Sequence, residues 1–319
     1  MVAIERAAIL LVLRGGRPTR VSALSEHAVA AIVDPAFILA DALMPSCRNV
    51  LCALGVITLL LTIAPVKLHA GELVQFDAIT TDAGSLRLLG YLARPRGPAA
   101  GQFPAVILLH HCGGFDELVV SWADRLSSWG YVALAIDSFG SRREPRNCTA
   151  RTYQAVDSSS AAEFLAKQEF VDSSRIAVFG FSQGGMAALR NAEQDSAFAK
   201  SHSDAFRAAV AFYPDCGGIS GIMAVPTLVL IGDLDDWTPA AACQAMAAGR
   251  ADIGLSRTEG DRSMVNLVVY PGVYHSFNLP LLRSITPGAR FMGHWLEYNA
   301  DADSDSVEKV KQFLRSNLQ

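Results

Sequence analysis

The pentapeptide at residues 180–184, Gly-Phe-Ser-Gln-Gly, constrains the local fold more than any other stretch of the chain. An apolar run at 175–179 precedes it and a helical stretch at 186–192 follows it, so the pattern predicts a strand that turns sharply into a helix. Glycine two residues before and two residues after the serine leaves room for such a turn. We therefore interpret the pentapeptide as a nucleophile elbow that presents the hydroxyl of Ser182, rather than as a loop in which Ser182 caps the helix.

Strand and helix patterns alternate along the chain after residue 70. Continuous apolar runs are typical of buried parallel strands, and amphipathic stretches are typical of surface helices. Strands are predicted at 76–81, 86–93, 105–109, 131–136, 208–212, 227–231 and 265–270, with a turn at 82–84, and helices at 118–129, 152–168 and 304–318. This alternation predicts an α/β protein with a mainly parallel, doubly wound sheet flanked by helices, formed by a single domain over residues 71–319.

The N-terminal part of the chain has a different composition. A short stretch containing Arg48 precedes an apolar segment at 50–66, and a small residue, Ala70, ends the pattern. These are the parts of a secretory signal, so we predict a signal peptide at 44–70 and export to the periplasm or the exterior, with no membrane span left after cleavage. An uncleaved anchor through 50–66 is the alternative, because that segment is just long enough to cross a bilayer. Residues 1–43 are interpreted as an upstream extension outside the mature protein.

Charge and cysteine content argue against some functions. The formal charge of -4, and the lack of basic runs interleaved with aromatic residues, argue against a nucleic-acid partner. Two of the six cysteines fall in the proposed signal. The other four, Cys112, Cys148, Cys216 and Cys243, can form two disulfides in an oxidising compartment, with three possible pairings. No CxxC motif or cluster of histidine and cysteine predicts a metal site.

The hydroxyl of Ser182 needs a base within hydrogen-bond reach and a group that orients the base. Ligands of such sheets bind beyond the carboxyl ends of the strands, so the loops that follow strands are the places to search. His275 follows the last predicted strand and is the candidate base. Asp235, which follows the strand before it, is the candidate acid. Asp233 and Asp236 compete with Asp235, and either could instead cap the next helix.

Two backbone amides must hold the oxyanion of a tetrahedral intermediate. The amide of Gln183 lies at the start of the helix behind the serine, where the helix dipole is positive. The loop at 110–114 contains two glycines, which let backbone amides approach a ligand closely. We therefore predict the Cys112 amide as the second donor, with a plain glycine turn as the alternative. His111 in the same loop and Trp237 beside the candidate acid are candidates for substrate binding.

Together these segments resemble the dienelactone hydrolase family of the α/β-hydrolase fold, from about residue 86 to residue 314. The resemblance is carried by the strand ending in His110 with the following Cys-Gly-Gly, by Asp137-Ser-Phe-Gly140, by the serine elbow, by Gly232 and Asp235 with Trp-Thr-Pro, by His275-Ser-Phe and by Tyr298-Asn-Ala. The order serine, aspartate, histidine is also that of α/β hydrolases. The resemblance implies hydrolysis of a small carboxylic ester or lactone through an acyl-enzyme, without a cofactor.

Two features depart from the family pattern. Members that act on dienelactone use a cysteine nucleophile, whereas this chain has Ser182. Those members also bind the substrate carboxylate with two arginines. Arg142 and Arg143 are the candidates for one of them, but the position four residues after His275 is Leu279. The departures imply an ester or lactone with less charge than dienelactone.

The resemblance also implies a disulfide pattern and leaves other functions open. In the usual strand order of this fold, the loops that carry Cys112 and Cys148 leave adjacent strands, as do the loops that carry Cys216 and Cys243. This order implies those two pairs. A binding protein that keeps the fold without catalysis, and a peptidase of the same fold, are the alternatives to the ester hydrolase.

Overall fold

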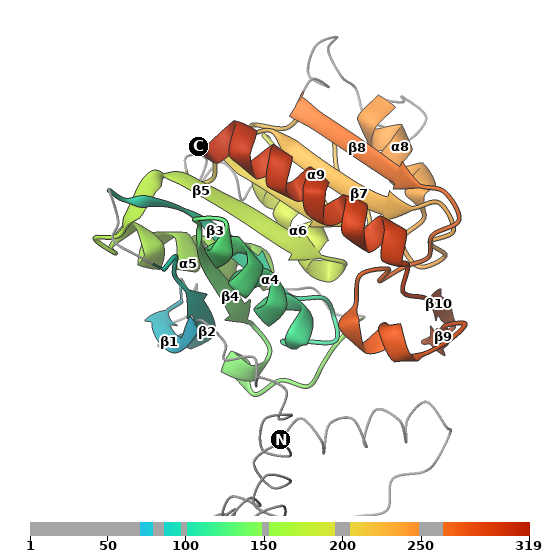
Figure 1. Cartoon of the computed structure of the whole chain (residues 1–319), viewed down its shortest axis with the longest axis horizontal. Coiled ribbons are helices and arrows are strands. Elements are labelled where there is room, and N and C mark those ends of the chain that lie inside the picture. The colour runs from blue at the N-terminus through green and yellow to red at the C-terminus, as the bar shows by residue number, and fades with distance from the viewer. Residues whose placement is uncertain (1–70, 79–85, 97–100, 149–152, 195–204, 249–263) are drawn as a thin grey trace, which may run out of the picture. The chain divides into compact units, whose positions relative to one another are not determined.

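The computed structural model describes residues 71–319 except for 79–85, 97–100, 149–152, 195–204 and 249–263 (Figure 1). The predicted upstream extension, the signal peptide or anchor and the turn at 82–84 lie outside the described residues. The chain from residue 70 onward forms one compact unit. Within the described ranges, no helix combines the length and the apolar character needed to cross a membrane.

A large sheet runs through the described part of the chain. Its eight strands are β1 Gly71–Asp77, β2 Arg87–Ala93, β3 Phe103–Leu109, β4 Val132–Asp137, β5 Val171–Phe181, β6 Ala208–Phe212, β7 Thr227–Gly232 and β8 Val265–Tyr270. They lie in the order β1-β2-β4-β3-β5-β6-β7-β8, and only the β1/β2 and β2/β4 pairs are antiparallel. The predicted mainly parallel sheet of an α/β-hydrolase fold is confirmed.

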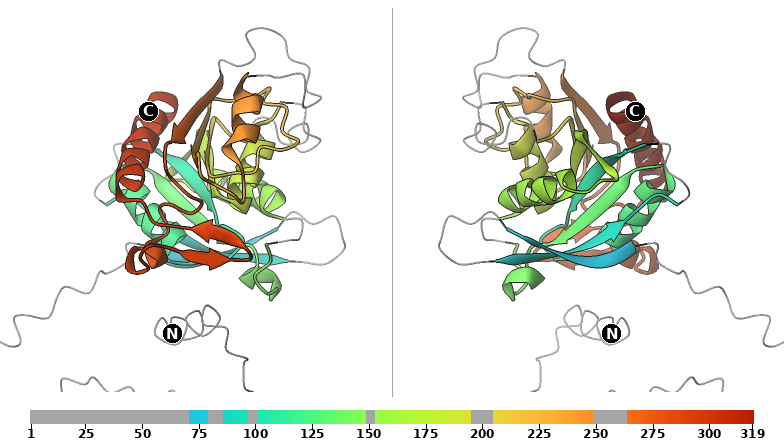
Figure 2. Two further views of the ribbon diagram at one scale, coloured as in Figure 1. Left: turned by 90° about the vertical axis from the view of Figure 1, so that its right-hand side faces the viewer. Right: turned by 90° about the vertical axis from the view of Figure 1, so that its left-hand side faces the viewer.

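Helices cover both faces of this sheet. Their bounds are α4 Glu117–Ser128, α5 Gln154–Ala166, α6 Gln183–Ala192, α8 Ala240–Ala248 and α9 Ala300–Leu318. Helices α4 and α9 lie on one face, and α5, α6 and α8 lie on the other (Figures 1 and 2). The arrangement is doubly wound, as the alternation of strands and helices predicts.

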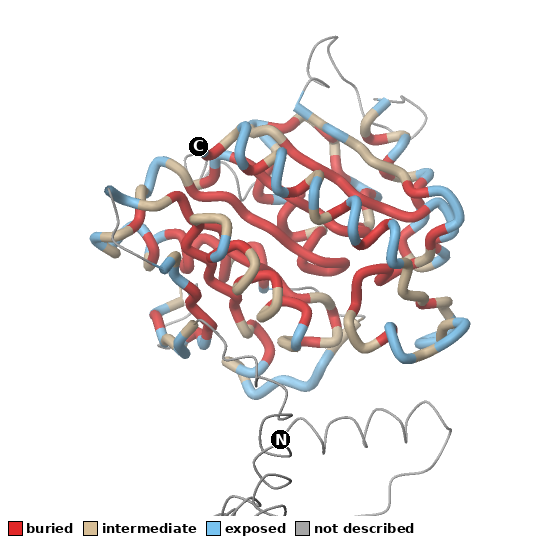
Figure 3. The backbone as a smooth tube through the Cα atoms, viewed as in Figure 1, coloured by how far each residue is buried: buried red, intermediate tan, exposed pale blue. Residues whose placement is uncertain are grey.

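The middle of the sheet is buried on both faces (Figure 3). The ring of Trp122 from α4 lies 4.9 Å from that of Phe179 and 5.6 Å from that of Phe212, and Phe181 and Phe277 complete the aromatic cluster. Truncation of one such ring to alanine costs about 3–5 kcal/mol. Phe181 precedes the candidate nucleophile directly, and Phe277 follows the candidate base by two residues. The cluster therefore supports the strand ends from which the candidate site is built.

Strand β1 and a second, small sheet differ most from the sequence-based expectation. Strand β1 covers residues 71–77 rather than 76–81, because it pairs along its whole length with β2, from Gly71 opposite Ala93 onward. Residues 79–81 lie outside the described part of the chain. A second, two-stranded sheet, β9 Ala289–Phe291 with β10 His294–Leu296, has no counterpart in the prediction. Strands of three residues are too short to show a periodic pattern.

Candidate active site

Ser182 lies on the sharp turn between β5 and α6, as the elbow motif predicts. Its backbone φ of 51° and ψ of -112° place it in a region that non-glycine residues rarely adopt. A Cβ atom at Gly180 would lie 2.0 Å from the carbonyl oxygen of Gly184, and a Cβ at Gly184 would lie 2.4 Å from that of Leu109. The two glycines are therefore required because the start of α6 packs directly against β5, the strand that precedes it, and against the end of β3.

Three loops that leave the carboxyl ends of β5, β7 and β8 bring the predicted serine, aspartate and histidine together. The Nε2 atom of His275 is 3.1 Å from the hydroxyl oxygen of Ser182, and its Nδ1 is 2.7 Å from Oδ2 of Asp235. The exposed fractions are 7%, 4% and 1% for the serine, aspartate and histidine. With Nδ1–H donating to the carboxylate, Nε2 is left as an acceptor for the serine hydroxyl.

The three aspartates of the loop after β7 have separate partners. Asp235 accepts from the backbone amides of Trp237 and Thr238 through Oδ1, at 3.0 and 2.8 Å, in addition to its contact with the imidazole. Asp233 accepts from the amide of Gly272 at 2.6 Å. Asp236 accepts from the amide of Trp295 at 3.0 Å. Of the three competing aspartates, Asp235 is the one placed beside the imidazole.

Two residues that the sequence analysis missed contact this set. The Thr238 hydroxyl lies 2.9 Å from Oδ2 of Asp235 and 3.2 Å from Nδ1 of His275. The ring of Tyr213 packs 4.7 Å from the imidazole, and its hydroxyl donates to Asn278 at 2.7 Å. Burial raises the pKa of the Tyr213 hydroxyl well above its usual range, so this group stays neutral. The Asp-x-x-Thr spacing is a local signal for Thr238, whereas Tyr213 follows a distant strand and has no local signal.

The loop after β3 forms the turn that contains the second predicted oxyanion donor. The Gly114 amide donates to the carbonyl of His111 at 3.0 Å, and the Gly113 amide donates to Nδ1 of His111 at 2.9 Å. Among the described residues, the Cys112 amide makes no hydrogen bond. The amide of Gln183 opens α6 at the positive end of that helix. Both predicted donors thus come from backbone beside the elbow.

The two histidines of this loop have partners inside the protein. His111 donates through Nε2 to Asp116 at 2.9 Å and accepts through Nδ1 from its own turn, so both ring nitrogens are engaged. The buried ring of His110 donates through Nδ1 to the His111 carbonyl at 2.7 Å and packs 4.7 Å from Phe139. Burial lowers the pKa of His110 to about 4. The substrate contact predicted for His111 is therefore not available to its ring nitrogens in this arrangement.

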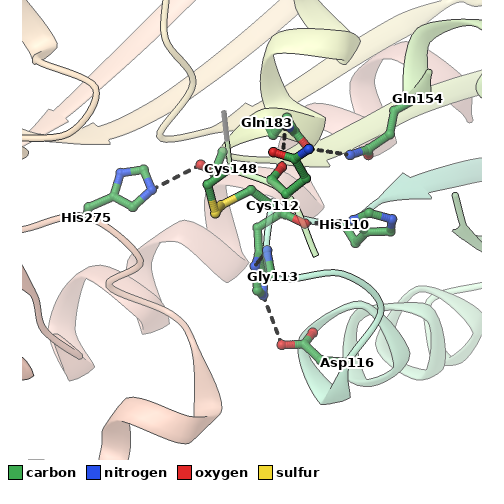
Figure 4. Close-up of a disulfide and its surroundings, with 11 residues drawn as sticks. His110, Cys112, Gly113, Asp116, Cys148, Gln154, Gln183 and His275 are labelled. Atoms are coloured by element: carbon green, nitrogen blue, oxygen red, sulfur yellow. Dashed lines mark hydrogen bonds and ion pairs between the residues drawn. A yellow bond between two sulfur atoms is a disulfide. The ribbon is translucent and has the colours of Figure 1, made fainter. Parts of the chain in front are cut away.

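Both predicted disulfides are present. Cys112 is bonded to Cys148, which joins the loop after β3 to the segment ahead of α5 (Figure 4). Cys216 is bonded to Cys243, which joins the loop after β6 to α8. The pairing implied by the resemblance is confirmed, and disulfides of this kind persist in oxidising compartments.

Arg142, a candidate for binding a substrate anion, has its charge engaged inside the protein. Its guanidinium donates twice to the carboxylate of Asp157, both at 2.8 Å, and once to the carbonyl of Ser138 at 2.9 Å. The same group lies 4.3 Å from the centre of the Tyr153 ring. Asp157 is fully buried, so removal of the arginine would leave a buried charge unpaired. The other candidate, Arg143, is exposed, with a left-handed φ of 56°.

Trp237 links the candidate base to the β9–β10 hairpin. Its half-buried ring lies 5.2 Å from the imidazole of the base, stacks on His294 at 4.9 Å and lies 5.9 Å from Phe291. The carbonyl of Asp236 accepts from Nδ1 of His294 at 3.0 Å, and its carboxylate accepts from the amide of Trp295. An apolar surface therefore extends from the base to the hairpin, and hydrogen bonds fasten the hairpin to the loop of the acid.

A mainly parallel sheet with a serine on a glycine elbow, beside a histidine and an aspartate from later strand ends, defines the α/β-hydrolase class. The sequence profile of the dienelactone hydrolase family matches residues 88–318. The chain belongs to the dienelactone hydrolase family.

Curated relatives are similar to parts of this chain. The quorum-quenching protein AidA of Acinetobacter baumannii is 28% identical over 166 residues, which cover 50% of this chain and 50% of that protein. The probable dipeptidyl-aminopeptidase B of Aspergillus terreus is 38% identical over 77 residues, which cover 22% of this chain and 8% of that protein. The matched segments thus span half or less of the length of these relatives.

Solved structures share the fold over most of the described chain. A dienelactone hydrolase-like promiscuous phosphotriesterase from metagenomic libraries superposes with a TM-score of 0.59 at 20% identity, covering 78% of this chain and 100% of that one. Esterase 2 of Thermogutta terrifontis superposes with a TM-score of 0.52 at 17% identity, covering 79% of this chain and 96% of that one. Dipeptidyl peptidase 4 of Porphyromonas gingivalis superposes with a TM-score of 0.54 at 16% identity, covering 78% of this chain and 35% of that one. At these identities the likeness concerns the fold alone.

Proposed function

We infer that this protein is a serine hydrolase that cleaves a small, weakly charged carboxylic ester or lactone through an acyl-enzyme. The observation that carries the proposal is the pair of contacts at His275, 3.1 Å to the hydroxyl of Ser182 and 2.7 Å to the carboxylate of Asp235. A base within reach of the nucleophile, oriented by a buried carboxylate, is what a serine hydroxyl needs for attack at neutral pH.

In the proposed acylation step, the oxygen of Ser182 forms a bond to the substrate carbonyl carbon while Nε2 of His275 takes the hydroxyl proton. Asp235 stabilises the imidazolium that results, and the amides of Cys112 and Gln183 donate to the oxyanion. Collapse of the intermediate breaks the bond to the leaving oxygen, which takes the proton from Nε2. Water then repeats the sequence on the acyl-enzyme, with His275 as base, and releases the acid.

Charge placement supports a substrate without a carboxylate at the reacting end. Arg142 is engaged by the buried Asp157, and an apolar Leu279 stands at the other position where the family pattern has an arginine. Trp237 offers an apolar contact beside the base. An ester or lactone whose group next to the carbonyl is apolar therefore fits the charges and the rings around the serine better than a lactone that carries a carboxylate does.

A peptidase is the second candidate, because some relatives and structural neighbours carry dipeptidyl peptidase names. Esters have a better leaving group than amides, so a site of this kind cleaves an ester first whichever substrate is native. Comparison of matched p-nitrophenyl esters and p-nitroanilides of the same acyl group separates the two candidates. We expect the ester to be turned over and the anilide not.

The two disulfides also support the proposal that the protein is exported.

Labelling with a fluorophosphonate tests the nucleophile. We expect one adduct on the peptide that contains Ser182, and loss of both the adduct and p-nitrophenyl acetate hydrolysis in Ser182→Ala. Loss of a triad serine lowers kcat by roughly 10⁵–10⁶-fold. The control is Ser128→Ala, on the exposed end of α4, which should label and turn over normally. An unlabelled but folded native protein would favour the binding-protein alternative.

A further inference from the structure

One short segment, Asn147–Cys148, contacts both residues whose amides form the proposed oxyanion hole. These two donors come from different parts of the chain, Cys112 after β3 and Gln183 after β5. Each of them has a side chain that reaches the same segment, one through a covalent bond and the other through a hydrogen bond (Figure 4).

The covalent contact fixes the Cys112 side of the hole. The disulfide to Cys148 fastens the residue whose amide has no acceptor among the described residues. The neighbouring amides of Gly113 and Gly114 are already directed into the turn, toward His111. The disulfide therefore acts on a residue of this turn whose amide makes no hydrogen bond to the described residues.

The hydrogen bond fixes the Gln183 side. The Nε2 atom of Gln183 donates to the carbonyl of Asn147 at 3.1 Å, and its Oε1 accepts from Nε2 of Gln154 at 3.4 Å. Only the side chain is used in these bonds, so the backbone amide of Gln183 remains directed by the start of α6. The side chain of the oxyanion residue thus holds the helix start against the segment that carries the disulfide.

The segment is itself fixed to the body of the protein on its N-terminal side. Arg142, five residues before Asn147, makes its double contact with the buried carboxylate of Asp157 in α5. Bidentate pairs of this kind fix orientation as well as distance. Arg142, one of the two arginines that the family resemblance offers for substrate recognition, is therefore placed to hold the segment.

We propose that Asn147–Cys148 is a positioning element that keeps the Cys112 and Gln183 amides aimed at one point. This proposal rests on the proposed function. It explains how two donors from separate loops keep a fixed position relative to each other. Preorganised donors stabilise an oxyanion because they do not have to move during the reaction, and a displacement of about 1 Å can cost roughly 100-fold in rate. The residues of the segment position the donors and touch no reacting atom.

The main test compares the two disulfides. The double variant Cys112→Ser/Cys148→Ser removes the disulfide but retains a backbone amide at position 112. The matched control is Cys216→Ser/Cys243→Ser, which removes the other disulfide. The cysteines of the two bonds are separated by 36 and 27 residues, so their removal should lower stability to a similar extent. We expect kcat for p-nitrophenyl acetate to fall by roughly 10–100-fold in the first variant only, with KM changed less than about threefold.

Inhibition by a trifluoromethyl ketone distinguishes a positioning role from a merely structural one, because a structural role would leave the inhibition constant unchanged. Its adduct with the serine carries an oxyanion, so its inhibition constant reports on the amides, whereas KM reports on ground-state binding. In the Cys112→Ser/Cys148→Ser variant, the inhibition constant should rise by the same factor by which kcat falls. The pH profile of kcat/KM should keep its midpoint, because His275 and Asp235 are untouched.

Gln183→Met tests the second contact with both disulfides intact. Methionine keeps the length of the side chain and the backbone amide but cannot donate to Asn147, so kcat should fall while KM holds. Combined with the loss of the Cys112–Cys148 bond, its effect should be less than additive, because both changes release the same segment. This variant keeps the proposal testable if the cysteine variant does not fold.

The outcomes separate this proposal from the proposed function. If kcat stays within about twofold in the folded Cys112→Ser/Cys148→Ser or Gln183→Met variant, or if the control disulfide variant loses as much kcat as the first, the positioning role is overturned while the hydrolase stands. If native protein fails to hydrolyse the ester and Ser182 does not react with the fluorophosphonate, the hydrolase itself fails.

Discussion

The two sides of the candidate site are held in place by different kinds of force. On the nucleophile side, van der Waals contact and a covalent bond dominate: a Cβ at Gly180 or Gly184 would overlap backbone atoms, and Cys112 is bonded to Cys148. On the base side, hydrogen bonds and ring contacts dominate, because His275 rests between the carboxylate of the acid loop and the rings of two aromatic residues.

This difference predicts two kinds of failure. Steric contacts and covalent links tolerate changes of charge but not of volume, so the nucleophile side should fail when an atom is added. Hydrogen bonds tolerate small changes of volume but not the exchange of a donor for an acceptor, so the base side should fail when one atom changes its chemistry.

The largest effect is expected from Asp235→Asn, which changes the chemistry of the base side without changing its size. The amide would donate to Nδ1 and so favour the tautomer with the proton on Nε2, which cannot accept the serine proton. The same change in a serine protease triad lowers kcat by about 10⁴-fold, and we expect a similar loss here, measured with p-nitrophenyl acetate.

Asp233→Asn is the matched control for that change. Asp233 lies two residues away and is exposed, and it contacts the Gly272 amide rather than the imidazole. We expect its kcat to stay within about threefold of the native value, as is usual for a change at an exposed position. Equal losses at both positions would contradict the assignment of the acid.

The second effect is expected from Gly184→Ala, which adds one carbon to the nucleophile side. Alanine stabilises a helix by about 1 kcal/mol relative to glycine, so propensity alone favours the change. A Cβ at this position would nevertheless lie 2.4 Å from the backbone carbonyl oxygen of Leu109, and neither backbone can move aside easily. We expect the clash to exceed the helix gain, with a net loss of about 4 kcal/mol in the free energy of unfolding in urea.

Gly101→Ala provides the comparison. No atom lies within 4 Å of a Cβ built at that exposed glycine, so the change should leave the free energy of unfolding nearly unchanged. If Gly184→Ala is as stable as Gly101→Ala, then the turn does not depend on close packing of backbone against backbone.

The sequence predicted the nucleophile side well because its constraints are local. The elbow agrees with expectation because its signal, a serine between two glycines with a strand pattern before it and a helix pattern after it, lies in one short stretch of sequence. The sheet also agrees, and both disulfides match the pairs that the family resemblance implied. The base side was predicted less completely. Thr238 has a local signal in its spacing to Asp235, but its contact with His275 and that of Tyr213 are made across the fold. The short strands of the hairpin carry no periodic signal. Arg142 shows the limit of motif transfer, because its buried partner Asp157 lies in another element and could not be read from the motif.

The third effect is a loss of stability in acid that originates at His110, in the loop after β3. Burial lowers the pKa of His110 to about 4, compared with 6.5 for an exposed histidine. The unfolded chain therefore binds more protons at this residue between these values, so stability is full above about pH 6.5 and falls as the pH drops to about 4, by about 3 kcal/mol. Unfolding in urea at a series of pH values measures this slope.

His110→Gln isolates that contribution. The amide can donate to the His111 carbonyl but does not titrate, so the variant should lose most of the slope between about pH 6.5 and pH 4. Asp116 does not obscure the result. The pKa of Asp116, which burial alone would raise, is held below its usual value of 3.8 by His111, so its protonation falls below this window. An unchanged slope in His110→Gln would show that another group is responsible.

The smallest effect is expected at Trp237, where the base side meets the proposed substrate. Its ring lies 5.2 Å from the imidazole and 5.9 Å from the ring of Phe291, so it offers apolar contact to an acyl or leaving group. Its side chain makes no hydrogen bond to Ser182, Asp235 or His275. Trp237→Ala should raise KM by about tenfold for p-nitrophenyl butyrate and by less for the acetate, since each buried methylene contributes about 0.8 kcal/mol. Trp237→Phe should retain most of the native preference for the butyrate over the acetate, because an aromatic face is kept. Equal losses for both esters would instead place the ring outside the acyl site, and its role would then be to support the imidazole from the side.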